Sequence, residues 1–192
     1  WNYRNHVQFH IAEDGKIGFI NSRGRNVLSI SECHLPVDEI NSFWPSLQFE
    51  GNTEVDRLAL RAGQDDELML VLESQKPETP ELEIEADISV VHVYEDHPVV
   101  IAGQDHFFIS ILGKEFRVSA GSFFQVNTLM AEKMVEHLLA KLPVTASSTL
   151  IDVYSGVGLF SKFFAPNCGR VIGIEESESS CEDFAFNLDE FV

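Results

Sequence analysis

The end of the chain alternates between short apolar segments and helical ones, and this alternation constrains the fold more than any other feature. Thr149–Tyr154 and Arg170–Ile174 are compact apolar runs with the length of buried strands. Leu159–Ala165 follows the first run, Ser180–Phe191 follows the second, and both segments are helical in character. A strand–helix–strand–helix order opens a doubly wound sheet, so we expect the two strands to be parallel neighbours.

Strands and tight turns dominate the chain before residue 118. Val7–Ile11 alternates between apolar and polar residues, and the Asp14-Gly15 pair after it is a hairpin signal. Leu58–Arg61 and Leu68–Leu72 indicate another hairpin. Further short strands are predicted at Lys16–Ile20, Val27–Ile30, Ile88–Val93, Val99–Ile101, Phe107–Leu112 and Glu115–Val118. The pattern predicts a mostly antiparallel, β-rich domain over residues 1–118.

Two further helices are predicted outside the strand–helix alternation. A short one runs from near Val37 to Pro45. A longer one covers Thr128–Leu142, with Asn127 as its N-cap and Pro143 ending it. Its spacing predicts an apolar side made of Leu129, Met134, Val135, Leu138, Leu139 and Leu142.

The charge of the chain is strongly negative. There are 31 acidic and 13 basic residues, for a net charge of −18. Such a field repels phosphate backbones at long range, which argues against binding of nucleic acid by electrostatics alone. A local basic site, or a partner domain that holds the nucleic acid, remains compatible with it.

Cysteine and histidine spacing indicates no metal site. Cys33, Cys168 and Cys181 are far apart, and no CxxC pair exists to form a zinc site or a redox pair. The seven histidines show no metal-ligand spacing either. Free cysteines of this kind fit a reducing cytosol, so we expect a cytoplasmic protein. No apolar stretch approaches the ~20 residues of a membrane-spanning helix, and no membrane partner is expected.

The two ends of the sequence suggest a piece of a longer protein. The chain starts at Trp1 without an initiator Met or a leader pattern, and it stops just after the second predicted parallel strand. A parallel sheet of two strands is too small for a stable domain of this class. We therefore expect an internal fragment whose oligomeric state the sequence does not reveal.

A glycine turn between the first parallel strand and its helix is the motif that carries chemistry. Gly156 and Gly158 form a G-x-G turn that delivers the chain to a helix N-terminus, where backbone N–H groups are free to bind a ligand. Glu175 lies seventeen residues after Gly158, at the end of the next strand. A carboxylate at that place can accept hydrogen bonds from both hydroxyls of a ribose.

Two cofactor classes fit this turn. A dinucleotide site requires the third glycine of G-x-G-x-x-G, and Ser161 stands there instead. S-adenosylmethionine has no phosphate and carries a sulfonium cation, so it tolerates an acidic surrounding. Both observations favour S-adenosylmethionine, although the two glycines could also form only a tight turn.

Several motifs resemble those of the bacterial RNA uracil-5-methyltransferases. The matching segments are Tyr3–Phe9, Ser31–Pro36, Ser122–Asn127, Asp152–Ser161 and Gly173–Glu175. The resemblance spans nearly the whole chain. Phe-Gln-Val-Asn at 124–127 and the turn around Cys33 are closer to the 23S rRNA branch than to the tRNA branch.

The resemblance implies a set of cofactor-binding residues. Gln125 is similar to the glutamine that contacts the methionine end of S-adenosylmethionine, and Tyr154 to an aromatic residue that borders the same cofactor. Gly156 and Gly158 form the loop itself, and Glu175 is similar to the acid that holds the ribose. The chain departs from the family at two positions. Ser155 stands where the family usually has Cys, and Leu159 stands where many members have Asn, which removes a possible polar contact.

The resemblance also implies what is missing. Methylation at C5 of uracil needs a nucleophile at C6, and the family uses a cysteine from a late motif. Neither Cys168 nor Cys181 lies in such a motif. In some members a cysteine matching Cys33 is the fourth ligand of an iron–sulfur cluster, but one thiolate cannot hold a cluster. Phe123 and Phe124 stand where the family has a substrate-side loop, although phenylalanines more often belong to a core.

The sequence therefore predicts an α+β and α/β chain. It would hold a β-rich central domain over residues 1–118 and the truncated N-terminal part of a Rossmann-like S-adenosylmethionine-binding methyltransferase domain over residues 119–192. The predicted function is that of a fragment of an enzyme that methylates C5 of uracil in RNA, with rRNA favoured over tRNA, and with no catalytic residue of its own. Two alternatives stay open: a non-catalytic β-rich binding module and a fragment of a dinucleotide-dependent oxidoreductase.

Overall fold

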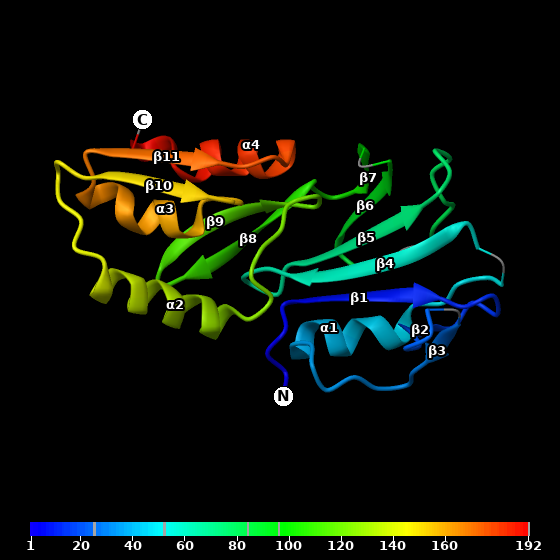
Figure 1. Ribbon diagram of the computed structural model, residues 1–192. Helices are drawn as coiled ribbons and strands as arrows, with labels where there is room; N and C mark the ends of the chain where they lie inside the picture. Colours follow the sequence, from blue (N-terminus) through cyan, green and yellow to red (C-terminus); the bar gives the residue numbers. More distant parts are fainter. Residues whose placement is uncertain (25, 52, 84, 96, 192) are drawn as a thin grey trace. The chain divides into compact units, whose positions relative to one another are not determined.

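The computed structural model describes residues 1–24, 26–51, 53–83, 85–95 and 97–191 (Figure 1). The chain divides into two compact units, Trp1–Phe107 and Phe108–Val192. The sequence predicts a boundary at residue 118, whereas most of β8 (His106–Ile111) and all of β9 (Lys114–Ser119) belong to the second compact unit. The physical reason lies in β9, whose backbone is bound by side chains of a helix near the end of the chain.

The first unit is built on one seven-stranded sheet with the strand order β3-β2-β1-β4-β5-β6-β7. The strands are β1 (His6–Ile11), β2 (Ile17–Ile20), β3 (Val27–Ser29), β4 (Val55–Ala62), β5 (Leu68–Ser74), β6 (Ser89–Tyr94) and β7 (His97–Ala102). All neighbours are antiparallel except β5 and β6, which are parallel. The predicted β-rich, mostly antiparallel character of this region is confirmed.

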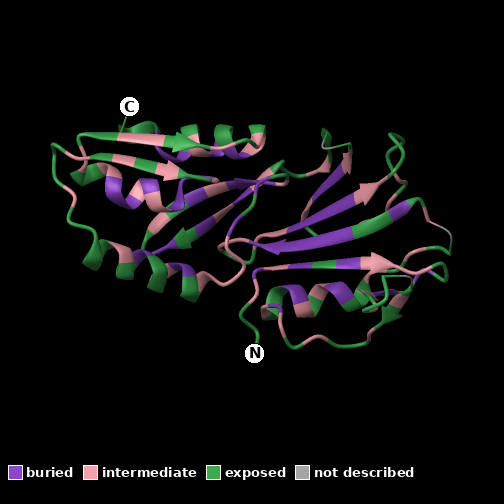
Figure 2. Cartoon of the chain, viewed as in Figure 1, coloured by how far each residue is buried: buried purple, intermediate pink, exposed green. Residues whose placement is uncertain are grey.

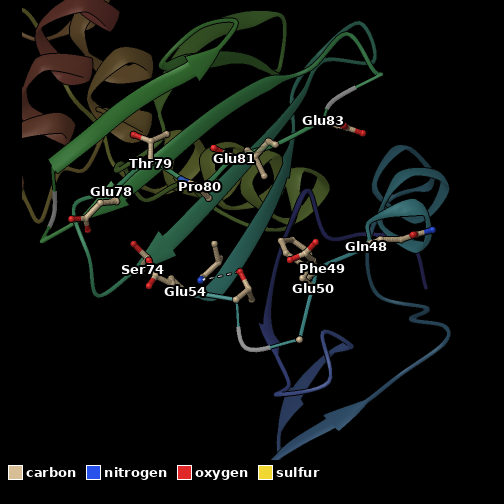
Figure 3. A pocket seen from close by; sticks show the side chains of 14 residues that line it. Gln48, Phe49, Glu50, Glu54, Ser74, Glu78, Thr79, Pro80, Glu81 and Glu83 are labelled. Carbon is tan, nitrogen blue, oxygen red and sulfur yellow. Dashed lines mark hydrogen bonds between the residues drawn. The ribbon is translucent and has the colours of Figure 1, made fainter.

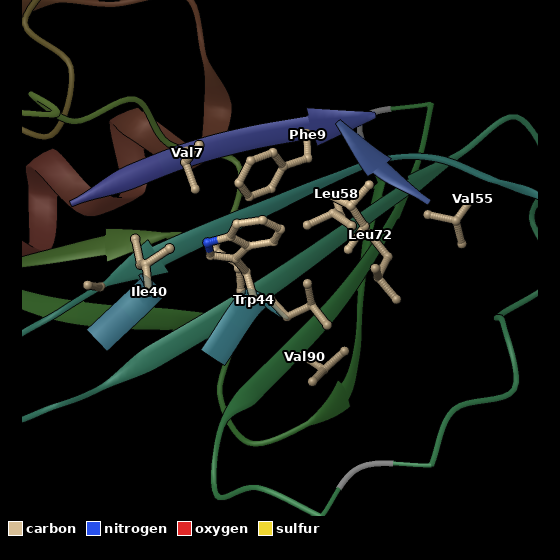
Figure 4. Packing of buried hydrophobic residues seen from close by; sticks show 12 residues of the cluster. Val7, Phe9, Ile40, Trp44, Val55, Leu58, Leu72 and Val90 are labelled. Atoms are coloured by element: carbon tan, nitrogen blue, oxygen red, sulfur yellow. The ribbon is translucent and has the colours of Figure 1, made fainter. Parts of the chain in front are cut away.

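The core of the first unit lies between the sheet and the short helix α1 (Asp38–Phe43), which continues into the 3-10 turn η1 (Trp44–Ser46). The ring of Phe9 on β1 packs against Trp44 with ring centroids 5.2 Å apart (Figure 4). Ile40 and Leu58 are fully buried in the same cluster. β1 buries alternate residues, whereas the central strands β4 and β5 are buried on both faces over much of their length (Figure 2).

The second unit contains the predicted strand–helix–strand–helix run. Its elements are α2 (Thr128–Lys141), β10 (Thr149–Val153), α3 (Leu159–Phe164), η2 (Ala165–Asn167), β11 (Arg170–Ile174), α4 (Glu178–Asn187) and η3 (Asp189–Phe191). β10 and β11 pair in parallel, with Thr149 opposite Arg170 and Val153 opposite Ile174. β8 and β9 form a separate two-stranded sheet. The predicted parallel neighbours are confirmed.

Helix α2 differs from the expectation in its burial. Asn127 caps it as predicted, because its side chain accepts a hydrogen bond from the Met130 N–H at 3.0 Å. Of the six residues expected to form an apolar side, however, only Val135 is buried, and Leu129 is among the most exposed. The helix packs against α3, and a six-residue helix covers only a narrow stripe of a helix of fourteen residues. Within the described part of the chain, no helix is both long and apolar enough to cross a membrane.

Leu58 and Leu28 offer a matched test of the first core. Leu58 is fully buried on β4 and Leu28 is 65% exposed on β3. Leu58→Ala should lower the free energy of unfolding by about 2–5 kcal/mol, because it removes buried apolar contacts and leaves a cavity. Leu28→Ala should cost less than about 0.5 kcal/mol. Urea unfolding followed by tryptophan fluorescence measures both, since Trp1 and Trp44 lie in this unit. Equal costs for the two variants would contradict the described core.

Candidate functional site

The glycine turn between β10 and α3 is held by the end of the neighbouring strand. The N–H groups of Tyr154 and Ser155 both donate to the Ile174 carbonyl oxygen, at 2.8 and 3.2 Å. Tyr154, Gly156 and Gly158 all have positive φ, at 62°, 53° and 89°. Three left-handed residues within five reverse the chain sharply, so that α3 begins directly at Leu159. The side chain of Tyr154 is 88% exposed beside this turn.

The two glycines of the turn serve different physical needs. At Gly158 a Cβ atom would lie 2.6 Å from Leu188 Cδ1 and 3.0 Å from Phe184 Cδ2, so a side chain there would collide with α4 and the residue after it. At Gly156 the nearest atom to a Cβ would be the Phe123 carbonyl oxygen, at 3.9 Å. Gly158 is therefore required for packing, whereas Gly156 leaves open space for a ligand close to the backbone.

Glu175 lies directly against this turn. Its Oε2 accepts a hydrogen bond from the Gly156 N–H at 2.8 Å, and its Oε1 accepts from the N–H groups of Glu176 and Ser177 at 2.9 and 3.0 Å. These backbone donors, Ser177 first and Gly156 next, hold the pKa of Glu175 below its usual value. A carboxylate offers about four acceptor positions, so this one keeps some capacity for a further donor.

The segment that carries Gln125 approaches the same turn. It joins β9 to α2, and the Phe123 carbonyl is its nearest point to Gly156. Phe124 is buried and packs against Phe116 with ring centroids 6.1 Å apart, which makes it a core residue. Phe123 is 66% exposed, and Gln125 is half-buried. The structure thus brings the segment of Gln125, the glycine turn and Glu175 into one region of the second unit.

Two polar residues of α4 hold this region together, and sequence reasoning missed both. The Asp183 carboxylate accepts hydrogen bonds from the Ser119 N–H, the Ser119 hydroxyl and the Ser122 hydroxyl, at 2.7, 2.8 and 2.6 Å. It also lies 3.2 Å from Arg117 Nε. The Asn187 side chain accepts a hydrogen bond from the Arg117 N–H and donates hydrogen bonds to the carbonyls of Arg117 and Val157.

A pattern in the sequence could have revealed them. Ser180, Asp183 and Asn187 stand at positions i, i+3 and i+7, which is one face of a helix, and all three are buried. A polar stripe at the spacing usually occupied by core residues indicates that this face of the helix packs against buried polar groups, here backbone groups and serine hydroxyls.

The first unit has a hollow of a different character (Figure 3). Its volume is about 690 Å³, and its lining is rich in glutamate: Glu50, Glu54, Glu78, Glu81 and Glu83. Lys76 pairs with Glu54 beside it. Among the residues that the structure describes, no three His, Cys, Asp or Glu side chains are placed to hold a metal ion. The hollow contains none of the residues that the sequence motifs single out.

Comparison with known proteins supports the resemblance given by the motifs. A family model described as tRNA (uracil-5-)-methyltransferase matches residues 98–191, just under half of the chain. An uncharacterized RNA methyltransferase of Streptomyces avermitilis is 28% identical over 98% of this chain and 45% of its own length. Another, of Chlorobaculum tepidum, is 36% identical over 47% of this chain and 19% of its own length. The chain spans a little under half the length of the Streptomyces relatives it matches.

A solved structure shows the same fold. The tRNA (uracil-54, C5)-methyltransferase of Pyrococcus abyssi, in complex with S-adenosyl-L-homocysteine, superposes with a TM-score of 0.69 over 98% of this chain and 53% of its own. The two sequences are 20% identical. The likeness confirms the predicted fold class, a β-rich part followed by the beginning of a Rossmann-like domain.

The two glycines of the turn should respond differently to the same substitution. Gly158→Ala should lower the free energy of unfolding by about 2–4 kcal/mol, because it adds overpacking to a strained φ. Gly156→Ala should cost only about 1 kcal/mol, because its surroundings are open. Circular dichroism of urea unfolding is the measurement, since the longer helices α2 and α4 lie in the second unit. A cost for Gly156→Ala as large as that for Gly158→Ala would show that Gly156 is also a packing residue.

Proposed function

We propose that this chain is part of an S-adenosylmethionine-dependent RNA (uracil-5-)-methyltransferase, and that its second unit holds one side of the cofactor site. The observation that carries the proposal is the ionised Glu175 carboxylate at the end of β11, joined to the Gly156 N–H and beside the segment of Gln125. An acid at this place accepts the hydroxyls of a ribose. The matched family model and the RNA methyltransferase relatives support the same assignment.

The geometry favours S-adenosylmethionine over a dinucleotide for two reasons. Oε2 of Glu175 already occupies the Gly156 N–H, which is the kind of donor that a pyrophosphate at a helix N-terminus would need, and its negative charge would repel that group. Ser161 replaces the third glycine of a dinucleotide turn. It is fully buried, and its hydroxyl donates to Asp152 Oδ2 at 2.7 Å, so a side chain fills the space where such a site needs close helix–strand packing.

Each site residue then has a role in holding the cofactor. Glu175 binds the ribose, Gly156 lets the ligand approach the backbone, and Gly158 keeps α4 packed behind the turn. Tyr154 supplies an exposed aromatic ring at the edge of the site, and Gln125 contacts the methionine end. When bound, S-adenosylmethionine supplies an electrophilic methyl group on a positively charged sulfur, and the acidic surrounding is compatible with that charge.

The nucleophile for C6 of uracil is not among these residues. Cys181 is exposed on α4, and its thiol lies 3.7 Å from the Glu175 carbonyl oxygen. Cys168 is half-buried after η2, and Cys33 lies in the first unit. We propose that none of the three performs this attack. The proposed RNA is 23S rRNA rather than tRNA, on the strength of the motif at 124–127 and the turn around Cys33.

The 192 residues by themselves should therefore not methylate uracil. Transfer of tritium from S-adenosyl-[methyl-³H]methionine to unmodified 23S rRNA and to tRNA transcripts is the assay. The tRNA (uracil-54, C5)-methyltransferase of Pyrococcus abyssi, acting on tRNA, is the enzyme control. We expect no incorporation above background for the 192-residue chain. Label recovered in 5-methyluridine would show that one of its own cysteines is the nucleophile, and loss of the label in Cys181→Ser would identify it.

The ribose contact gives the direct test of the cofactor site. In the full-length enzyme, Glu175→Ala should weaken binding of S-adenosylhomocysteine roughly tenfold to a hundredfold, because a hydrogen bond to a charged group contributes ~1.5–3 kcal/mol. Glu176→Ala is the matched control, because this neighbouring side chain is exposed. Calorimetric titration measures both. Equal losses, or no loss for Glu175→Ala, would leave Glu175 as an acid that only ties β11 to the glycine turn.

A further inference from the structure

The carboxylate of Asp183 is fully buried, and the partners that it has among the described residues lie on the segment before Gln125. Ser119 donates to it twice and Ser122 once, at distances of 2.6–2.8 Å. Arg117, on β9, provides the compensating positive charge, with its Nε 3.2 Å from Asp183 Oδ1. A buried carboxylate is costly unless it is hydrogen-bonded and paired. Here both conditions are met by one short stretch of chain, residues 117–122.

This stretch determines the position of Gln125. The Ser122 N–H donates to the Ser119 carbonyl at 2.9 Å, which closes a tight turn three residues before Gln125. On the other side, Asn127 caps α2 two residues after Gln125. The backbone of residues 123–126 is therefore anchored at both ends, by Asp183 at the front and by the helix cap at the back.

Asp183 is also connected to Glu175 through the start of α4, which follows shortly after the end of β11. The Ser177 side chain caps α4 by accepting from the Ser180 N–H, and the Ser177 N–H donates to Glu175. The Glu175 carboxylate thus lies at the start of the helix whose second turn carries Asp183. One turn further on, Asn187 donates to the Val157 carbonyl of the glycine turn at 2.9 Å.

We propose that Asp183 is a positioning residue for the cofactor site. By holding Ser119 and Ser122, it sets the place of Gln125 relative to Glu175, so that the groups binding the methionine end and the ribose end keep the spacing of one cofactor molecule. The inference rests on the proposed function. It assigns to Asp183 on α4 a part in ligand binding that is exerted through Ser119 and Ser122.

A positioning role makes a selective prediction. Adenosine has the ribose but no methionine part, so its binding depends on Glu175 and not on Gln125. The binding of S-adenosylhomocysteine depends on both residues. Removing a hydrogen bond between Asp183 and the 119–122 turn should therefore weaken the binding of S-adenosylhomocysteine and leave the binding of adenosine nearly unchanged. A general loss of stability in this unit would weaken the binding of both ligands.

Ser122→Ala is the primary variant, because it removes one of the three hydrogen bonds to Asp183 and leaves the carboxylate paired. Its affinity for S-adenosylhomocysteine should fall about tenfold, and its affinity for adenosine less than twofold. Ser161→Ala is the matched control. It also deletes a buried serine hydroxyl that donates to an aspartate of the same unit, but that aspartate is Asp152 on β10. The ratio of its two affinities should stay at the wild-type value.

A second variant and a double-mutant cycle separate positioning from stability. Asp183→Asn keeps the shape of the side chain and should shift the same ratio in the same direction. Gln125→Ala should remove the contact that Asp183 serves, so adding Ser122→Ala to it should cost no further affinity for S-adenosylhomocysteine. Thermal unfolding by circular dichroism verifies that each variant titrated is folded.

The outcomes distinguish the two proposals. A folded full-length wild-type enzyme that binds neither ligand overturns the proposed function. If the wild-type protein binds both ligands, and Ser122→Ala and Asp183→Asn weaken the binding of both equally, the positioning role is overturned. The proposed function is unaffected by that result. Additive losses in the double variant with Gln125→Ala also overturn the positioning role. A selective, non-additive loss supports it.

Discussion

The second unit depends on the way in which α4 replaces a strand beside β9. The Asn187 side chain bonds both the N–H and the C=O of Arg117, at 2.8 and 3.0 Å, which is the pair of bonds that a neighbouring strand would otherwise make. Its second amide hydrogen reaches the Val157 carbonyl. One amide thus joins β9, α4 and the glycine turn. Because these backbone groups are buried or part-buried, losing their partner would leave them poorly satisfied.

Several basic side chains of the second unit are engaged in contacts within the protein, which limits the groups available to bind RNA phosphates. Lys114 donates to the Lys162 carbonyl and lies over the ring of Phe163, 5.3 Å from its centroid. Lys162 donates to the Glu115 carbonyl, and burial lowers its pKa. Arg117 lies over Phe186 and beside Asp183. These positive charges hold β9, α3 and α4 together, so the contacts to RNA phosphates that the proposed function requires must come from other groups.

The sequence predicted best what depends on neighbouring residues. The parallel pair β10–β11, the Asn127 cap and the place of Glu175 at a strand end all follow from local patterns of period, capping and spacing, and the structure contains all three. It did not predict the parallel pairing of β5 with β6, because short apolar strands carry no mark of their partner's direction. The exposure of Leu129 on α2 was missed for a related reason. Periodicity identifies the apolar side of a helix but not how much of that side is covered.

Asp183 and Asn187 were missed because their partners are distant in sequence. They bind residues 61 to 70 positions earlier, and Asn187 also binds one 30 positions earlier. Whether a polar residue on a helix faces solvent or buried backbone is decided by that tertiary contact and not by its own neighbours.

The glycine pattern itself shows how far such a motif can be trusted as a sign of a ligand. A Cβ at Gly158 would lie 3.0 Å from the Phe184 ring, and one at Gly173 would lie 2.8 Å from the same ring. Phe184 therefore fits into a notch formed by two glycines, one from the turn and one from β11, and this packing alone would select both. Gly156 has no such neighbour, since its surroundings are open and its N–H faces Glu175. Of the glycines in the motif, Gly156 is the one that packing does not explain. Its positive φ of 53° favours glycine, and its open surroundings leave room for the cofactor proposed above.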